Sequence, residues 1–512
     1  MSITARPNEA QSVVDAFKKA LDGVTPDFHI KSRPDGDFLV FEFSNPVARL
    51  YKLLNEINDE LPEDHPFRNR SSIAKRNKKP ANVLVTPEAL MLQRELSSTL
   101  TVDKNTFGDD FLSRYTESVT ALETNIVLQA NHAVYGRRGS GKSSLLAYAM
   151  HQLRLKNLPY AWVAMQTYAS RTDKQAVASV LASILREVSQ YAPVETDFTS
   201  IAEELENLSE SDDENSVYSR LTRLMPRVRR MLGGIATAAR PLTIFLDDIH
   251  VLGPELQPEL LAFLYSLTRG NCTYIKLSGI EQLTNLWDST SKRGLESPHD
   301  VQTLILDHNL TNPDQSREHI VSILDRHAVF CGLPGIQYIA DDNYLDRLVL
   351  SAAAVPRDAM SLFSKSITRS LTKKQKTVSI LSLNAAASEA IEEKLKDVEK
   401  DISNDDKKAI SACLERVKAF CLTDQKANAF LVKIQNSSPG YANVQRLIAL
   451  RFVHLLHEGI TPHKAGERYV ALMLDYGFYI GIRAAKSITL FPDKPRSLTA
   501  KELRTLPIFV AD

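Results

Sequence analysis

The amino-acid sequence predicts an α/β protein whose centre is a parallel sheet with helices on both faces. Three observations predict it. A glycine-rich segment, residues 136–143, lies between a short apolar strand and a helix. Another apolar strand, residues 242–246, ends in two consecutive aspartates. Between residues 106 and 310 strands alternate with helices, which is typical of a parallel sheet covered on both faces.

Length and charge limit the possible classes of protein. The 512 residues suggest about three domains. We expect regions 1–105, 106–310, 311–404 and 405–512, the first with no assigned role. Hydrophobic content of 43% and charged content of 24% are ordinary for a globular protein. The 62 basic and 62 acidic residues give a formal net charge of +0, so any nucleic-acid surface must be local.

Segments that would direct the chain to a membrane or an oxidising compartment are not expected. No run of about 18 apolar residues is present, so we predict no membrane span and no membrane partner. The charged N-terminal segment lacks the apolar centre of a signal peptide. The four cysteines show no C-x-x-C pairing, which indicates reduced thiols rather than a zinc site. We therefore expect a cytoplasmic protein.

The N-terminal region carries no motif. Helical periodicity over residues 8–21 and 49–61, with an apolar strand over 38–43, predicts a small α+β region. Residues 67–80 hold six basic residues and no acidic one. This segment either contacts phosphates or is a solvated linker.

The glycine-rich segment fits G-x-x-x-x-G-K-[ST], the phosphate-binding loop. Glycines let the backbone turn its N–H groups toward a polyphosphate. Lys142 supplies positive charge to the β- and γ-phosphates, and the Ser143 hydroxyl can ligate Mg²⁺. The helix from Ser144 adds partial positive charge at its N-terminus. The predicted phosphate-binding residues are Gly136, Arg137, Arg138, Gly139, Ser140, Gly141, Lys142, Ser143 and Ser144.

The acidic strand end predicts a metal ligand and a base. A strand buried on both faces reads as a continuous apolar run, and ligands of open α/β sheets lie at the carboxyl ends of such strands. Asp247 is expected to hold Mg²⁺, directly or through water. Asp248 is placed to orient or deprotonate a water that attacks the γ-phosphate. Further strands are predicted over 133–135, 160–165, 273–280 and 301–306, with polar Ser278 near the end of one of them.

With these elements placed, the chain resembles a P-loop ATPase of the AAA+ kind. It is most similar to the prokaryotic type of the origin-recognition initiator branch, which borders the STAND ATPases. Residues 353–360 resemble the G-x-P-R-x-A stretch that opens the third helix of the helical lid, with Ala354 in the place of glycine. The resemblance implies that Arg357 is the sensor-2 arginine and Ser278 the sensor-1 residue. It places the trans-acting arginine finger at Arg293.

The resemblance implies an ATPase that uses ATP and Mg²⁺ and assembles as a homo-oligomer. Asp248 stands where typical AAA+ hydrolases have glutamate, so hydrolysis is expected to be slow. We expect a nucleotide-driven switch or assembly factor, with genome maintenance or defence against phages and mobile elements as the implied setting. An origin-type initiator that loads a partner onto DNA stays an alternative. A nucleotide-binding scaffold that never turns over is a third.

For two further segments, the sequence is compatible with more than one kind of partner. Residues 201–232 change from acidic to basic, and the arginines at helical spacing (Arg220, Arg223, Arg227, Arg229 and Arg230) face DNA, a neighbouring subunit or water. Residues 405–512 are predicted to form a winged helix-turn-helix, with helices over 407–420 and 443–456 and wing strands over 468–474 and 478–482. Their 16 basic and 10 acidic residues suit double-stranded DNA, while docking of a protein effector is the alternative.

Overall fold

The computed structural model divides the chain into two compact units. It describes residues 7–34, 36–102, 104–105, 108–169, 171, 175–192, 198–210, 213–306, 309–401, 404–435, 437–461, 466–480, 488–492 and 494–511. The central unit comprises Val102–Leu112 and Glu117–Asp307. The flanking unit comprises Met1–Thr101, Ser113–Thr116 and His308–Asp512. Helix α4 (Asp109–Arg114) crosses from the first into the second.

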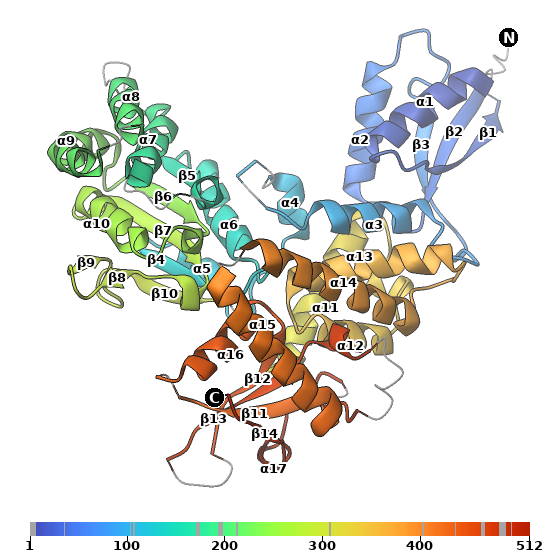
Figure 1. The fold of residues 1–512 in the computed structure, drawn as a ribbon. Coiled ribbons are helices and arrows are strands. Elements are labelled where there is room, and N and C mark those ends of the chain that lie inside the picture. The colour runs from blue at the N-terminus through green and yellow to red at the C-terminus, as the bar shows by residue number, and fades with distance from the viewer. Residues whose placement is uncertain are drawn as a thin grey trace. The chain divides into compact units, whose positions relative to one another are not determined.

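The central unit alternates strands with helices, as predicted (Figure 1). Its strands are β4 (His132–Tyr135), β5 (Tyr160–Ala164), β6 (Leu242–Asp247), β7 (Thr273–Gly279), β8 (Trp287–Asp288), β9 (Arg293–Gly294) and β10 (Gln302–Ile305). Its helices are α5 (Leu122–Ile126), α6 (Lys142–Leu155), α7 (Gln175–Ser189), α8 (Phe198–Ser209), α9 (Glu214–Ile235) and α10 (Leu256–Thr268). Short 3₁₀ turns lie at Met165–Tyr168, Ile249–Val251 and Glu281–Leu283.

Five of these strands form one sheet in the order β10-β4-β7-β6-β5, and every neighbouring pair is parallel. All four residues of β4 are buried, and five of the six residues of β6. This is why these strands read as continuous apolar runs in the sequence. The register aligns Val134 with Ser278 and Ala164 with Asp247, so the carboxyl ends of the strands meet at one edge of the sheet.

The flanking unit begins with a small α+β region, also as predicted. Its elements are α1 (Pro7–Ala20), β1 (Asp27–Arg33), β2 (Gly36–Phe43), α2 (Ala48–Glu60), β3 (Ser71–Lys75) and α3 (Pro87–Ser98). The strands form a sheet of order β1-β2-β3. The basic segment 67–80 is therefore partly a strand, and Arg76 pairs with the buried carboxylate of Glu88 at 3.1 Å.

The rest of the flanking unit is mainly helical, and it contains the predicted lid. Its helices are α11 (Pro313–Phe330), α12 (Asp342–Ser351), α13 (Pro356–Thr372), α14 (Ile380–Asp401), α15 (Asn404–Ala419), α16 (Pro439–Ala449) and α17 (Ala500–Arg504). Shorter turns span Ile336–Tyr338, Phe420–Asp424 and Tyr476–Phe478. One hydrophobic core runs through the whole unit, from Ala10 to Ala511. The predicted α/β fold with a helical lid is confirmed.

The C-terminal segment differs from its prediction. It holds a sheet of order β12-β13-β11-β14, built from β11 (Ala429–Lys433), β12 (Val453–Ile460), β13 (Tyr469–Leu474) and β14 (Ile508–Phe509). The helix expected over 443–456 ends at Ala449, and the chain continues as β12. Arg451 adopts a left-handed conformation, and the N–H of Phe452 donates to the Leu447 carbonyl at 3.0 Å. This Schellman turn ends the helix.

The wing strands are also corrected. β13 covers the first of them, but its antiparallel partner is β12 rather than residues 478–482. Tyr476–Phe478 forms a 3₁₀ turn instead, and Gly481 and Ile482 lie outside the described residues. The winged helix-turn-helix as a whole stays a prediction.

A buried network of charged side chains joins α13 and α14 to this C-terminal segment. The Asp358 carboxylate lies 2.5 Å from the Arg451 guanidinium and 3.4 Å from the Lys394 ammonium. Lys394 also reaches Asp475 at 2.9 Å, and Asp475 lies 3.0 Å from His454. Burial raises the pKa of Asp358, but the charges of Arg451 and Lys394 outweigh burial and hold the pKa below its usual range. The network is thus charge-balanced inside the unit.

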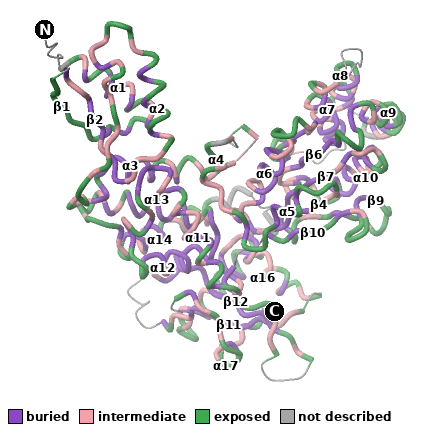
Figure 2. Tube along the Cα trace, turned by 180° about the vertical axis from the view of Figure 1, so that it is seen from behind, coloured by how far each residue is buried: buried purple, intermediate pink, exposed green. Residues whose placement is uncertain are grey.

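Burial follows the layers in both units. Figure 2 shows β4, β6 and β7 as buried, and the outer parts of α8, α9 and β1 as exposed. Among the helices of the described part of the chain, none combines the length and apolar character that crossing a membrane needs.

Candidate nucleotide-binding site

The glycine-rich loop connects the end of β4 to the start of α6, and each of its three glycines is required by the backbone. Gly139 and Gly141 have φ angles of 82° and 102°, in the left-handed region that side chains disfavour. A Cβ atom at Gly136 would collide with the Leu306 carbonyl oxygen and the Ser140 hydroxyl. The loop therefore takes the tight course that the motif predicts.

The loop residues fit a bound polyphosphate. Lys142 is the first residue of the 14-residue helix α6, so its ammonium group and the positive end of the helix lie together. The Lys142 side chain is buried, and its Nζ donates to the Arg137 carbonyl at 3.2 Å. The Ser140 hydroxyl oxygen is buried and has no hydrogen-bond partner among the described residues. A buried polar atom of this kind calls for a ligand that would satisfy it.

The acid pair lies beside this loop because β6 is two strands away from β4 in a parallel sheet. The Ser143 hydroxyl donates to Asp247 Oδ1 at 3.0 Å, and the Ser278 hydroxyl donates to the same atom at 2.6 Å. Ser278 also accepts a hydrogen bond from the backbone N–H of Asp248 at 2.7 Å. The structure thus brings together the loop, both aspartates and the predicted sensor-1 serine.

The hydroxyl of Ser143 and the carboxylate of Asp247 are the kinds of oxygen ligand that suit Mg²⁺. Burial raises the pKa of Asp247 to about 6, and the neighbouring charge of Asp248 adds to the rise. Hydrogen bonds from Ser278 and Ser143 and the charge of Lys142 oppose it. Mg²⁺, when bound, would compensate the negative charge that burial disfavours. The donor set therefore fits this metal.

Sequence reasoning missed one residue of the site. His250 Nδ1 lies 3.7 Å from Asp248 Oδ1, and the imidazole is buried. Burial lowers the pKa of His250 to about 4, with the charges of Lys142 and Arg138 acting in the same direction and Asp248 against them. A neutral imidazole therefore borders the proposed base. Its only signal in the sequence is its place two residues after Asp248.

The two predicted arginines have different surroundings. Arg293 lies on β9, 3.8 Å from the Glu259 carboxylate and with its guanidinium 5.0 Å from the centre of the Tyr218 ring. These partners belong to α10 and α9 rather than to the loop or the acid pair. Arg357 belongs to the flanking unit, where it is the second residue of α13 and is exposed. The roles of both arginines stay predictions.

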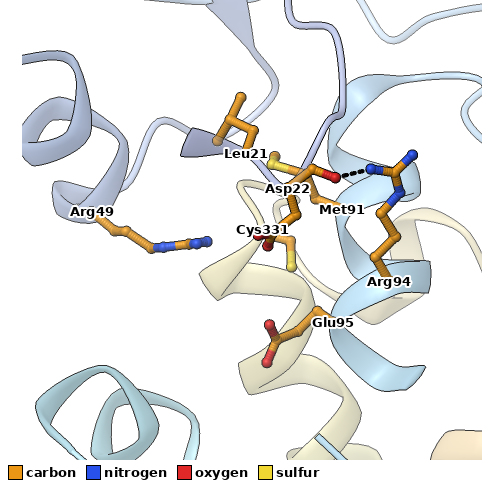
Figure 3. Close-up of a pocket in the computed structure, with 7 residues that line it drawn as sticks. All are labelled: Leu21, Asp22, Arg49, Met91, Arg94, Glu95 and Cys331. Atoms are coloured by element: carbon orange, nitrogen blue, oxygen red, sulfur yellow. Dashed lines mark hydrogen bonds between the residues drawn. The ribbon is translucent and has the colours of Figure 1, made fainter. Parts of the chain in front are cut away.

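A second group of charged residues lines a small pocket in the flanking unit (Figure 3). Glu95 lies 3.1 Å from Arg114 and 3.3 Å from His327, and the Arg94 guanidinium donates to the Asp22 carbonyl. Burial raises the pKa of Glu95, but the hydrogen bond with the His327 side chain and the positive charge of Arg114 outweigh burial and hold this pKa below its usual range. These charges are compensated within the unit, so we interpret the group as structural.

The fold and the site define a class of protein. A parallel sheet of order β10-β4-β7-β6-β5, with a glycine-rich loop after β4 and an acid pair after β6, is that of a P-loop nucleotide-binding protein. Residues 124–275 match the family described as AAA ATPase domain. The chain therefore carries a P-loop AAA+ ATPase domain, and that prediction is confirmed.

Solved structures that are similar to the chain include origin-recognition proteins. Drosophila ORC bound to DNA is 13% identical, with 86% of this chain and 99% of that chain covered and a TM-score of 0.37. The Aeropyrum pernix ORC1 protein in complex with DNA is 15% identical, with 75% and 93% covered and a TM-score of 0.38. A Walker-type ATPase of Pyrococcus abyssi is 13% identical, with 71% and 93% covered and a TM-score of 0.41. No curated protein matches the sequence.

Proposed function

We propose that the chain is a nucleotide-driven switch that binds ATP with Mg²⁺ and hydrolyses it slowly to ADP and phosphate. One observation carries the proposal. The hydroxyl of Ser278 bridges the Asp247 carboxylate and the Asp248 backbone N–H beside Ser143 of the loop. These hydrogen bonds support the proposal, because they join a loop residue to both aspartates, which we propose as metal ligand and base.

Each residue has a distinct task in this proposal. The loop N–H groups and Lys142 bind the phosphates, and Ser143 and Asp247 hold the metal. When bound, Mg²⁺ would neutralise part of the negative charge of the phosphates. Asp248 orients a water and accepts its proton, while the water oxygen bonds to the γ-phosphorus and the bond to the bridging oxygen breaks. Asp248 is one methylene shorter than glutamate, which is why we expect slow turnover.

The two arginines complete the proposed switch. Arg357, exposed at the start of α13, is proposed to sense the γ-phosphate and couple it to the position of the lid. Arg293 is proposed to act on the nucleotide of a neighbouring subunit in a homo-oligomer. Mixing Lys142→Ala with Arg293→Ala chains tests this. Restored turnover in the mixture, with neither variant active alone, is the expected result, since only mixed interfaces pair a wild-type loop with a wild-type arginine.

The switch is tested by calorimetric titration with Mg·ATP and Mg·ADP. We expect heat of binding from the wild type and none from Lys142→Ala. Lys156→Ala, which removes an exposed charge at the other end of the same helix, is the control and should bind normally. Absence of heat from the wild type would overturn the proposal.

Turnover then separates the alternatives. Slow basal hydrolysis that Asp248→Asn abolishes supports the switch. Hydrolysis that appears only with duplex DNA favours an initiator that loads a partner. Binding without any turnover, with or without DNA, favours a scaffold.

A further inference from the structure

Helix α9 carries a line of arginines that the proposed site does not use. Arg220, Arg223, Arg227 and Arg230 are separated by three, four and three residues, a spacing that places them on one face of a helix. All four are exposed, and α9 is among the exposed helices in Figure 2. The helix has no acidic residue after Glu214. We call these four residues the arginine stripe.

Among the residues that the structure describes, the arginine stripe has no ion-pair or hydrogen-bond partner. None of its four side chains forms an ion pair or a hydrogen bond with any residue that the structure describes. The fifth arginine of the helix shows the contrast, because Arg229 donates to the carbonyls of Ser266 and Arg269 at 2.7 Å each. Arg229 therefore stabilises the end of α10, while the four charges of the stripe are paired with none of the described residues.

The opposite face of α9 fixes the helix in place. Val217, Leu221, Val228 and Leu232 are almost fully buried in the core of the central unit. The ten residue-to-residue steps from Arg220 to Arg230 span about 15 Å at 1.5 Å per step. The stripe is therefore a line of positive charge on a helix that is anchored from behind.

We propose that the arginine stripe binds the phosphate backbone of double-stranded DNA. The guanidinium group can contact phosphate oxygens through two parallel N–H bonds. Duplex DNA carries about one negative charge per 1.7 Å of its axis, so a 15 Å line meets several phosphates. The proposal goes beyond the proposed function, because it adds a DNA-binding surface to the central unit that holds the nucleotide site.

Two alternatives fit the stripe less well. Single-stranded nucleic acid is usually held by exposed aromatic rings on which bases stack. The one aromatic residue of α9, Tyr218, packs against Phe263 and Arg293 instead. The acidic helix α8 of a second copy is the other alternative. Its Glu206 already accepts two hydrogen bonds of 2.7 Å from Arg186, so one of the three acidic side chains of α8 is paired within the chain.

The test compares two variants with equal charge. The stripe variant carries Arg220→Gln, Arg223→Gln, Arg227→Gln and Arg230→Gln. The control carries Lys156→Gln, Arg240→Gln, Arg269→Gln and Lys292→Gln, four exposed basic residues elsewhere in the central unit. Binding to a fluorescent duplex of about 40 base pairs is followed by anisotropy at several salt concentrations. Each lost phosphate contact lowers the magnitude of the slope of log K against log[salt] by about 0.9, so the stripe variant, which loses four arginines, should lose about 3.6.

We expect the control to lose less than about 1 from this slope. Equal loss in both variants, an unchanged slope in the stripe variant, or no binding of duplex DNA by the wild type would overturn the proposal. So would preference of the stripe for single-stranded DNA or duplex RNA. A change of oligomer mass in the stripe variant, with DNA binding intact, would assign the stripe to a second copy.

Calorimetry with Mg·ADP on the same proteins separates this proposal from the proposed function. Normal nucleotide binding by the stripe variant shows that the central unit is folded, so lost DNA binding then belongs to the stripe. Absence of nucleotide binding by the wild type would count against the proposed switch. The DNA-binding proposal would then still be decided by comparing the stripe variant with the control variant.

Discussion

The hydroxyl oxygen of Ser278 lies 2.7 Å from the backbone nitrogen of Asp248 and accepts its hydrogen bond. Asp248 has φ 60° and ψ 49°, a left-handed conformation that is costly for a residue with a side chain. Ser278 is fully buried and also donates to Asp247. We infer that this serine positions the acid pair and keeps the Asp248 peptide in its strained conformation.

Replacement of Ser278 by alanine should lower turnover and leave binding nearly intact. The Asp248 N–H loses its acceptor and Asp247 loses a donor, so the base is less well placed. We expect kcat to fall by about 10- to 100-fold, as for other lost positioning bonds, with the Kd of Mg·ADP changed by less than about threefold. Ser278→Thr keeps the hydroxyl and should restore part of the rate. Equal rates for Ser278→Ala and the wild type would contradict this role.

Magnesium-dependent nucleotide binding should weaken as the pH falls through about 6. Protons and Mg²⁺ compete for the Asp247 carboxylate, whose pKa burial raises to about 6 from 3.8. At about pH 5 we expect a loss of about tenfold in the affinity that Mg²⁺ adds to ADP binding. Calorimetric titrations across pH, with metal-free ADP as the control, measure it. If the affinity that Mg²⁺ adds to ADP binding stayed constant down to about pH 5, the pKa of Asp247 would not be raised, which would contradict the prediction.

Replacement of Arg357 by alanine should reduce hydrolysis and ATP binding but not ADP binding, because the proposed contact is with the γ-phosphate alone. Arg369→Ala is a matched control, since Arg369 lies on the same helix and pairs at 2.8 Å with Glu389. The ratio of the Kd values for Mg·ATP and Mg·ADP is the readout. If this ratio were equal in the Arg357→Ala and Arg369→Ala variants, Arg357 would have no role in recognising the γ-phosphate.

The buried charge network should show strong coupling between Asp358 and Arg451. Arg451→Met or Asp358→Asn alone leaves an uncompensated buried charge, which we expect to cost about 3 kcal/mol of unfolding free energy. The double variant leaves Lys394 paired with Asp475 at 2.9 Å and should cost less than the sum of the single changes. Urea unfolding of the full chain measures the cycle. Additivity within about 0.5 kcal/mol would indicate independent side chains.

Most of the central unit could be predicted from the sequence because its signals are local. The loop glycines at 136, 139 and 141, the apolar strands and the acid pair each have a required spacing, and the parallel sheet then brings their ends together. His250 could not be found in this way. Its position two residues after Asp248 gives no indication that its ring lies buried against that carboxylate.

The C-terminal segment shows why periodicity alone can be wrong. The run from Leu447 to Leu456 is apolar enough for either a helix or a strand. Its state is decided by the left-handed turn at Arg451 and by pairing of β12 with β13, a contact distant in sequence. The charge network could not be predicted either, because Asp358 and Arg451 are 93 residues apart.

The single hydrophobic core of the flanking unit has a consequence for synthesis of the chain. That core joins Ala10 to Ala511, whereas the central unit lies wholly between residues 102 and 307. As the chain leaves the ribosome, the central unit is complete first and can fold as it emerges. The first hundred residues must wait for α11 and α13, which follow the central unit in the sequence, so we expect them to be the segment most dependent on chaperones during translation.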